Sequence, residues 1–89
     1  MRAVITVVGK DMVGIVSRVA GACTTCNINV TEVTQSVLQD LFCMIMLADI
    51  SKANLPFGEF AETMKKLGEE LGLSIHVMHE DIFNSMHRI

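Results

Sequence analysis

The sequence has little aromatic character, with no tryptophan, no tyrosine and four phenylalanines among 89 residues. Sheets that bind RNA need exposed aromatic rings on their central strands, and only Phe42 falls in a segment with strand character. A basic excess is also absent, because seven Lys and Arg face ten Asp and Glu, a net charge of −3. No apolar run approaches the roughly 20 residues of a membrane-spanning helix. We therefore expect no nucleic-acid partner and no membrane partner.

Targeting signals, paired cysteines and catalytic motifs are missing as well. Gly9-Lys10-Asp11 interrupts the apolar start of the chain, which does not fit a cleavable signal peptide. Three cysteines are an odd number, which suits reduced thiols in a cytoplasmic protein better than a disulfide framework. The sequence has no nucleophile elbow, no phosphate-binding loop and no zinc helix motif. We expect a cytoplasmic domain that is not an enzyme and holds no cofactor.

Hydrophobic periodicity predicts six main elements and a short seventh. Strand patterns cover residues 3–8, 28–38, 41–48 and 73–78, helical patterns run from Asp11 to Asn27 and from Pro56 to Gly72, and a short helical segment covers about 81–87. Two of these strands, 3–8 and 41–48, are apolar on both sides, which is typical of central strands. The partly polar strand 28–38 is expected at an edge.

This order of elements predicts one α+β domain over residues 1–89 with a ferredoxin-like βαββαβ fold. Right-handed crossovers and a central hairpin give a four-stranded antiparallel sheet with both helices on one face. The other face then carries an apolar strip, which we expect the C-terminal segment, a partner subunit or both to cover. A domain of this size is only modestly stable alone, so oligomerisation is expected.

The connection Gly9-Lys10-Asp11-Met12-Val13-Gly14 is a candidate anion site. If Asp11 caps the following helix, the N–H groups of Met12, Val13 and Gly14 lie in its first turn, where the helix dipole favours a carboxylate or a phosphate. The negative charge of Asp11 disfavours phosphate, whereas a zwitterion also offers an ammonium to a nearby acceptor. The alternative is a capped helix after an ordinary glycine turn.

Cys23-Thr24-Thr25-Cys26 has the spacing of a redox or metal-binding pair, but it ends a helix instead of beginning one. The helix dipole lowers a thiol pKa only at the N-terminal end. Both cysteines continue the apolar stripe of Ile15 and Val19, so we predict that they pack in the core. The same prediction applies to Cys43, on a central strand.

Histidine and methionine do not predict a metal site. His76 and His79 are three residues apart on a strand, so their side chains should point to opposite faces. Met44, Met46 and Met64 occupy predicted core positions. Packing therefore explains these methionines, and we expect no metal.

Several segments together resemble the ACT domain, a small ligand-sensing module. They are Val7-Val8-Gly9-Lys10-Asp11-Met12-Val13-Gly14-Ile15-Val16, then Asn27-Ile28-Asn29-Val30, Thr34-Gln35-Ser36 and the closing Ile82-Phe83. The resemblance covers essentially the whole chain. It is strongest to short stand-alone ACT proteins of bacteria and archaea, and it extends to the ACT domains of formyltetrahydrofolate deformylase and the glycine-cleavage repressor.

The resemblance implies side-by-side pairing of two chains, with a small ligand, usually an amino acid, at the seam. The first loop of one chain would then meet the second strand of its neighbour. The implied ligand-binding residues are Gly9, Lys10, Asp11, Met12, Val13, Gly14 and Ile15 from one chain, with Asn29, Thr31 and Gln35 from the other. The sequence departs from the family pattern at Val30-Thr31-Glu32, which leaves the partner of a ligand ammonium open.

The leading hypothesis is a homodimeric regulatory domain that binds an amino acid at the subunit seam and acts on a separate protein. The first alternative is an interaction module that dimerises and docks on another protein without a ligand. The second is a metal or redox carrier that uses Cys23 and Cys26. Ligand screening and thiol labelling of the folded protein distinguish the three.

Overall fold

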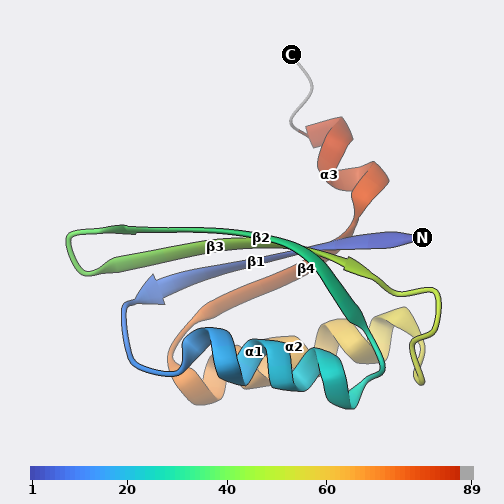
Figure 1. Cartoon of the computed structure of the whole chain (residues 1–89), viewed down its shortest axis with the longest axis horizontal. Helices are drawn as coiled ribbons and strands as arrows, with labels where there is room; N and C mark the ends of the chain where they lie inside the picture. Colours follow the sequence, from blue (N-terminus) through green and yellow to red (C-terminus); the bar gives the residue numbers. More distant parts are fainter. Residues whose placement is uncertain (87–89) are drawn as a thin grey trace.

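A computed structural model describes residues 1–86, and in that part of the chain four strands form one antiparallel sheet with two helices on one face (Figure 1). The elements are β1 (Arg2–Lys10), α1 (Ile15–Thr25), β2 (Asn29–Leu38), β3 (Leu41–Asp49), α2 (Phe57–Leu71), β4 (Ser74–His79) and α3 (Glu80–Met86). The strand order β2-β3-β1-β4 puts β1 and β3 in the centre and β2 at an edge. The predicted ferredoxin-like fold is confirmed, and position 87, the predicted end of the last helix, lies outside the described residues.

The core lies between the sheet and the two helices. It includes alternate residues of the central strands, among them Ile5, Val7, Met44 and Met46, with Val19 and Cys23 from α1 and Phe60 and Met64 from α2. Directly opposite residues of antiparallel strands share a face, so the β1–β3 register gathers these side chains in one layer. Full burial of a side chain of this size contributes about 1.5–3 kcal/mol relative to exposure.

A β-bulge in β2 overturns part of the face assignment made from the sequence. The pairing with β3 jumps from Val30 to Glu32 and leaves Thr31 as the extra residue. Thr31 Oγ1 donates a hydrogen bond to a β3 backbone carbonyl at 3.2 Å. An extra residue shifts the alternation of side chains by one. Gln35, expected on the face of Asn29, therefore lies on the other face, opposite a core methionine of β3.

Helix α1 begins later than predicted. Its N-cap is Gly14, at φ 89° and ψ 5°, and no side chain of the described residues makes a capping bond there. Glycine adopts this left-handed conformation without steric cost. The prediction that Asp11 caps the helix is wrong, because Asp11 still belongs to the loop, where its N–H bonds to the carbonyl of Asp40 at 2.8 Å. The other end matches the prediction, since Asn27 has φ 58°.

Helix α2 is bounded by the predicted residues and packs closely on β4. Pro56 is its N-cap, and Gly72 ends it at φ 73°. A Cβ at Gly68 would lie 2.7 Å from the carbonyl oxygen of Leu73, and a Cβ at Gly9 would lie 2.5 Å from Leu73 Cδ2. Two glycines thus allow the end of β1, the end of α2 and the start of β4 to meet.

The cysteine predictions are confirmed at two positions and wrong at the third. Cys23 and Cys26 are buried in the core. The pKa of the Cys23 thiol is raised to about 11, mainly by burial and to a smaller extent by the neighbouring Cys26. Cys43 is only half-buried, because it alternates along β3 with the core residues Phe42 and Met44 and so lies on the opposite face of the sheet.

His76 and His79 lie on opposite faces of β4, as predicted, because they pair with Thr6 and Ala3 of β1. The ring of His79 stacks on that of Phe57, with 4.1 Å between the ring centroids. Within residues 1–86, no group of three or more His, Cys, Asp or Glu side chains could hold a metal ion. In the same part of the chain, no helix is long and apolar enough to cross a membrane.

Helix α3 rises from the sheet face opposite α1 and α2, which we call the open face (Figure 1). Arg2 forms an ion pair with Glu80 and so ties α3 to β1. Val4 is buried, whereas Val8 and Ile45 remain exposed. The C-terminal segment therefore covers part of the apolar strip and leaves the rest open.

Candidate functional site

The predicted loop residues and Asn29 lie at the two ends of one edge of the molecule, the edge formed by β2 and α1 (Figure 1). Residues 9–15 connect β1 to α1 beside the β2–β3 hairpin, to which they are hydrogen-bonded through Asp11 N–H and the Asp40 carbonyl. Asn29 begins β2 at the opposite end, just after α1 has ended. One chain alone therefore does not bring the two groups together.

At the loop end, the first turn of α1 presents backbone donors. The first hydrogen bond of the helix runs from Arg18 N–H to the Gly14 carbonyl, at 2.9 Å. The N–H groups of residues 15–17 precede it, and a helix provides no internal acceptor for them. These amides, and not those of residues 12–14 as predicted, form the positive end of the helix dipole.

The side chains of this loop differ in their access to a ligand. Lys10, Asp11, Met12 and Val13 are exposed. Ile15 is buried in the core, so only its backbone can contact a ligand. The loop therefore offers a ligand backbone amides, one basic and one acidic side chain (Lys10 and Asp11) and two apolar side chains (Met12 and Val13).

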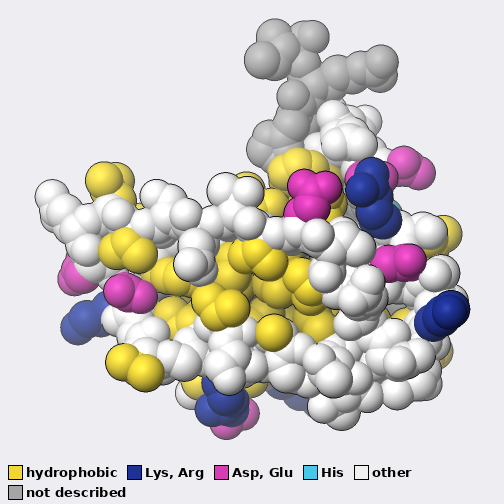
Figure 2. Space-filling view, viewed as in Figure 1, with side chains coloured by type: hydrophobic (Ala, Val, Ile, Leu, Met, Phe, Trp, Pro, Cys, Tyr) yellow, Lys and Arg dark blue, Asp and Glu magenta, His cyan; other side chains and the backbone are white. Residues whose placement is uncertain are grey.

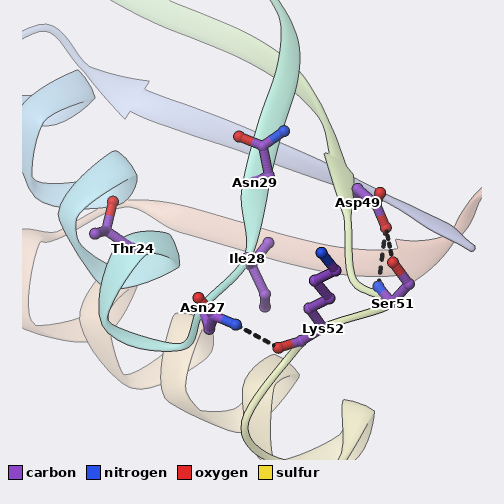
Figure 3. A pocket seen from close by; sticks show the side chains of 7 residues that line it. All are labelled: Thr24, Asn27, Ile28, Asn29, Asp49, Ser51 and Lys52. Carbon is purple, nitrogen blue, oxygen red and sulfur yellow. Dashed lines mark hydrogen bonds between the residues drawn. The ribbon is translucent and has the colours of Figure 1, made fainter.

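A polar cavity of about 270 Å³ occupies the other end of the edge (Figure 3). Its lining residues come from the end of α1, the start of β2 and the end of β3 with the following loop: Thr24, Asn27, Ile28, Asn29, Asp49, Ser51 and Lys52. Asp49 and Lys52 give it one charge of each sign. A volume of this order suits a small polar molecule.

Hydrogen bonds join the walls of this cavity across the chain. Asn27 Nδ2 donates to the Lys52 carbonyl at 2.7 Å. Asn54 donates from its backbone N–H to the Cys26 carbonyl at 3.0 Å and from Nδ2 to the Thr25 carbonyl at 3.0 Å. The loop after β3 is therefore fastened to the end of α1.

Asp49 lines this cavity, and the sequence interpretation did not single it out. Its Oδ1 accepts a hydrogen bond from the Ser51 hydroxyl at 2.6 Å and one from the Ser51 N–H at 2.9 Å. The hydroxyl, and then the backbone N–H, lower the pKa of Asp49, so the group is an anion at neutral pH. An aspartate followed two residues later by a serine at the end of a strand is a turn signal that could have drawn attention to it.

Of the three residues implied on the second strand, only Asn29 lines this cavity. Thr31 is the bulge residue, and its hydroxyl is bonded to β3. Gln35 is exposed farther along the strand, on the face that the helices share. The second strand thus divides its polar side chains between different surfaces.

An exposed apolar strip lies along the edge between the start of α1 and the outer part of β2. Figure 2 shows hydrophobic side chains gathered between β2 and α1. The strip consists of Val13, Val16, Val33 and Val37, all exposed, and we call it the seam strip. Apolar surface beside an edge strand with unpaired backbone groups is typical of a contact surface.

The comparisons with known proteins agree with this architecture. A family model described as ACT domain matches residues 2–78, and the chain belongs to the ACT domain family. A UPF0237 protein of Methanopyrus kandleri is 44% identical over 88 residues, which cover 99% of this chain and 98% of that protein. The structure of an ACT domain protein from Streptococcus pneumoniae has a TM-score of 0.81 and 32% identity, with 93% of each chain covered.

Two further solved structures contain the same fold as part of longer chains. A putative glycine cleavage system transcriptional repressor has a TM-score of 0.72 and 27% identity, over 85% of this chain and 43% of that one. A formyltetrahydrofolate deformylase from Pseudomonas syringae pv. tomato has a TM-score of 0.79 and 21% identity, over 88% and 27%, a likeness of fold. The resemblance inferred from the residues is confirmed, and ACT domains are small-molecule-binding regulatory domains.

Proposed function

We propose that the protein is a homodimeric ACT regulator that binds an amino acid at the seam between two copies. Residues 9–15 of one copy and the cavity at Asn29 of the other would form each site. The observation that carries this proposal is the position of these two half-sites at opposite ends of the same open edge.

Two-fold symmetry explains how half-sites at opposite ends become complete sites. In an isologous dimer the same patch of each copy meets the other. An axis perpendicular to the sheet sets the two β2 edges antiparallel and keeps the helices of both copies on one side. The loop of residues 9–15 then lies beside the partner's cavity, and the dimer has two equivalent sites.

The seam strip supplies a driving force for such pairing. Val13, Val16, Val33 and Val37 are exposed in the single chain. A second copy would remove them from water, and apolar burial contributes roughly 25 cal/mol per Å². Pairing would also cover the exposed edge of β2.

The two half-sites have complementary chemistry for a zwitterion. The N–H groups of residues 15–17 at the start of α1 suit a carboxylate. Asp49, an anion beside the amide of Asn29, suits an ammonium. Asp49 thus takes the role that the departure at Val30-Thr31-Glu32 left open, while Glu32 belongs to the open face.

Regulation would follow from the linkage between ligand and dimer. A ligand that needs both copies stabilises the pair, by about 2.7 kcal/mol per site at a hundredfold excess over Kd. The occupied dimer would then present its surface to a separate protein, with no chemical step on the ligand. We place this regulator in the cytoplasm, consistent with the free thiols of Cys23, Cys26 and Cys43.

A thermal-shift and calorimetric screen of the twenty amino acids, at concentrations where sedimentation shows a dimer, tests the proposal. We expect at least one amino acid to raise Tm and to strengthen the dimer. Asp49→Asn should weaken its binding about tenfold or more, whereas Asp81→Asn, on α3, should not. A chain that is monomeric at every concentration and silent across the panel contradicts the proposal.

The ligand-free interaction module is favoured by the same seam strip, which any apolar partner could cover. It predicts a dimer or a mixed complex that Asp49→Asn does not alter and that no amino acid strengthens. The metal or redox carrier predicts fast thiol labelling in native buffer. Burial of Cys23, which raises its pKa to about 11, predicts slow labelling instead.

A further inference from the structure

The open face of the sheet carries a second cavity, on the opposite side of β2 from Val33 and Val37 of the seam strip. Its volume is about 300 Å³, and it lies between the sheet and α3. The apolar side chains that line it include Val4, Ile45, Leu47 and Phe83, and two acidic residues, Glu32 and Glu80, also line it.

Strand register explains why these residues meet. Leu47 of β3 is opposite Val4 on one side and Glu32 on the other. Directly opposite residues share a face, so three strands supply the floor and one acidic side chain. Helix α3 supplies the remaining wall through Glu80 and Phe83. The β2 bulge is what places Glu32 on this face.

The charges that the described residues place around the cavity do not cancel. Glu80 is paired with Arg2. Glu32 is exposed, and within residues 1–86 no Lys, Arg or His side chain forms an ion pair with it. Among residues 1–86, the cavity thus combines an apolar floor with one negative charge that no described cation pairs with.

We propose that this cavity binds a small organic ammonium ion with an apolar body. The ammonium would pair with Glu32, and the body would lie on Val4, Ile45 and Phe83. An α-amino acid fits poorly, because its carboxylate would approach Glu32 and Glu80, and like charges repel. The site therefore goes beyond the proposed function and selects against the ligands of the seam.

Three probes that share one ring test this proposal: 2-phenylethylamine, the neutral 2-phenylethanol and the zwitterion phenylalanine. Each is titrated into the whole protein and followed by calorimetry and by the NMR signals of the Val4, Ile45 and Leu47 methyl groups. We expect saturable shifts with the amine, binding at least about tenfold weaker with the alcohol, and no shift of these methyls with phenylalanine. A response of the seam residues to phenylalanine reports on the proposed function separately.

Paired variants locate the binding. Glu32→Gln should weaken binding of the amine about tenfold and leave binding of the alcohol unchanged. Glu62→Gln, at an exposed glutamate of α2, should change the binding of neither. Ile45→Lys puts a competing ammonium into the cavity and should abolish amine binding. Val8→Lys is its control, because Val8 is on the same face and similarly exposed, at 41% against 44% for Ile45, but does not line the cavity.

Three outcomes overturn the proposal. One is the absence of saturable amine binding by the wild-type chain. Another is equal amine affinity in Glu32→Gln and the wild type. The third is an Ile45→Lys variant that changes only the oligomeric state, which would identify the open face as a contact between copies.

Discussion

The two edges of the sheet are built in opposite ways. At the β4 edge, α2 approaches so closely that a side chain at Gly68 would collide with the backbone of Leu73. At the β2 edge, α1 leaves Val33 and Val37 exposed on the face that the helices share. The comparison indicates that packing at one edge holds the fold together, while the other edge stays open for contact.

Chain connectivity accounts for the difference. Only Gly72 and Leu73 separate α2 from β4, so the helix end and the strand start are forced together. The β2–β3 hairpin, in contrast, extends past the helix layer (Figure 1). Beyond the bulge at Thr31, Val33 and Val37 lie on the face that the helices share and yet remain exposed.

We call the β4 edge the closed edge and the β2 edge the open edge. The largest expected effect on stability is at the closed edge. Gly68→Ala should destabilise the protein by about 3 kcal/mol, because its Cβ would lie 2.7 Å from a backbone oxygen that cannot move freely. Urea unfolding measures the change. Gly21→Ala in α1 is the matched control: nothing lies within 4 Å of the new Cβ, so it should stabilise by about 0.5–1 kcal/mol. Equal stability of the two variants would refute the close approach.

Cys23 tests the core near the open edge. Cys23→Ser should destabilise by about 2 kcal/mol, because it buries a hydroxyl in apolar surroundings. Urea unfolding beside Cys23→Ala separates the polar penalty from the loss of the sulfur. A Ser variant as stable as the wild type would remove Cys23 from the core.

The same thiol predicts a loss of stability at high pH. Its pKa is raised from 9.0 to about 11 by folding, so the unfolded chain loses this proton first. The contribution is complete below pH 9 and disappears as the pH rises through 11. Between pH 8 and 11 the free energy of unfolding should therefore fall more steeply with pH for the wild type than for Cys23→Ala. Parallel curves would contradict this.

Gly14 tests the open edge. Gly14→Ala should destabilise by about 1 kcal/mol, because the residue has φ +89° although no atom crowds a new Cβ. If the amides of residues 15–17 bind a ligand, the free energy of ligand binding should fall by more than the free energy of unfolding does. Calorimetry with an amino acid found in the screen measures the first and urea unfolding the second. Undiminished stability would show that another residue tolerates this turn.

The smallest effect on stability is expected in the seam strip. Val37→Ser should change the unfolding of the isolated chain by less than about 0.5 kcal/mol, since the side chain is already exposed. It should nevertheless weaken the dimer, as measured by sedimentation. Val8→Ser, on the open face, is the control and should leave this dimer intact. If both variants dimerise like the wild type, the open edge is not the contact.

Periodicity was enough to predict the order of the elements, which strands are central and that the polar strand lies at an edge. The all-apolar segments became β1 and β3, and the polar one became the edge strand β2. The start of α1 was mispredicted, because Asp11 has the chemistry of a cap while Gly14 has the backbone freedom that the turn required. The bulge was also missed, although the apolar positions change phase across Thr31, from Ile28 and Val30 to Val33 and Val37.

Of the two parts of the candidate site, the sequence could predict the loop but not the cavity. The glycine loop is continuous in sequence and can be recognised there. The cavity at the other end depends on Asn29 lying opposite Asp49, twenty positions away, through the β2–β3 register. Cross-strand pairing of that kind is a property of the assembled sheet.

The sequence by itself determined the ferredoxin-like fold, because alternation and helical spacing are local consequences of which side chains avoid water. It also determined that Cys23 and Cys26 are core residues, since they continue a helical stripe. Only the tertiary structure decided which edge is closed, which face Glu32 occupies and where Asp49 lies. These features depend on register, on one extra residue in a strand and on backbone distances, and such quantities exist only once distant segments have packed together.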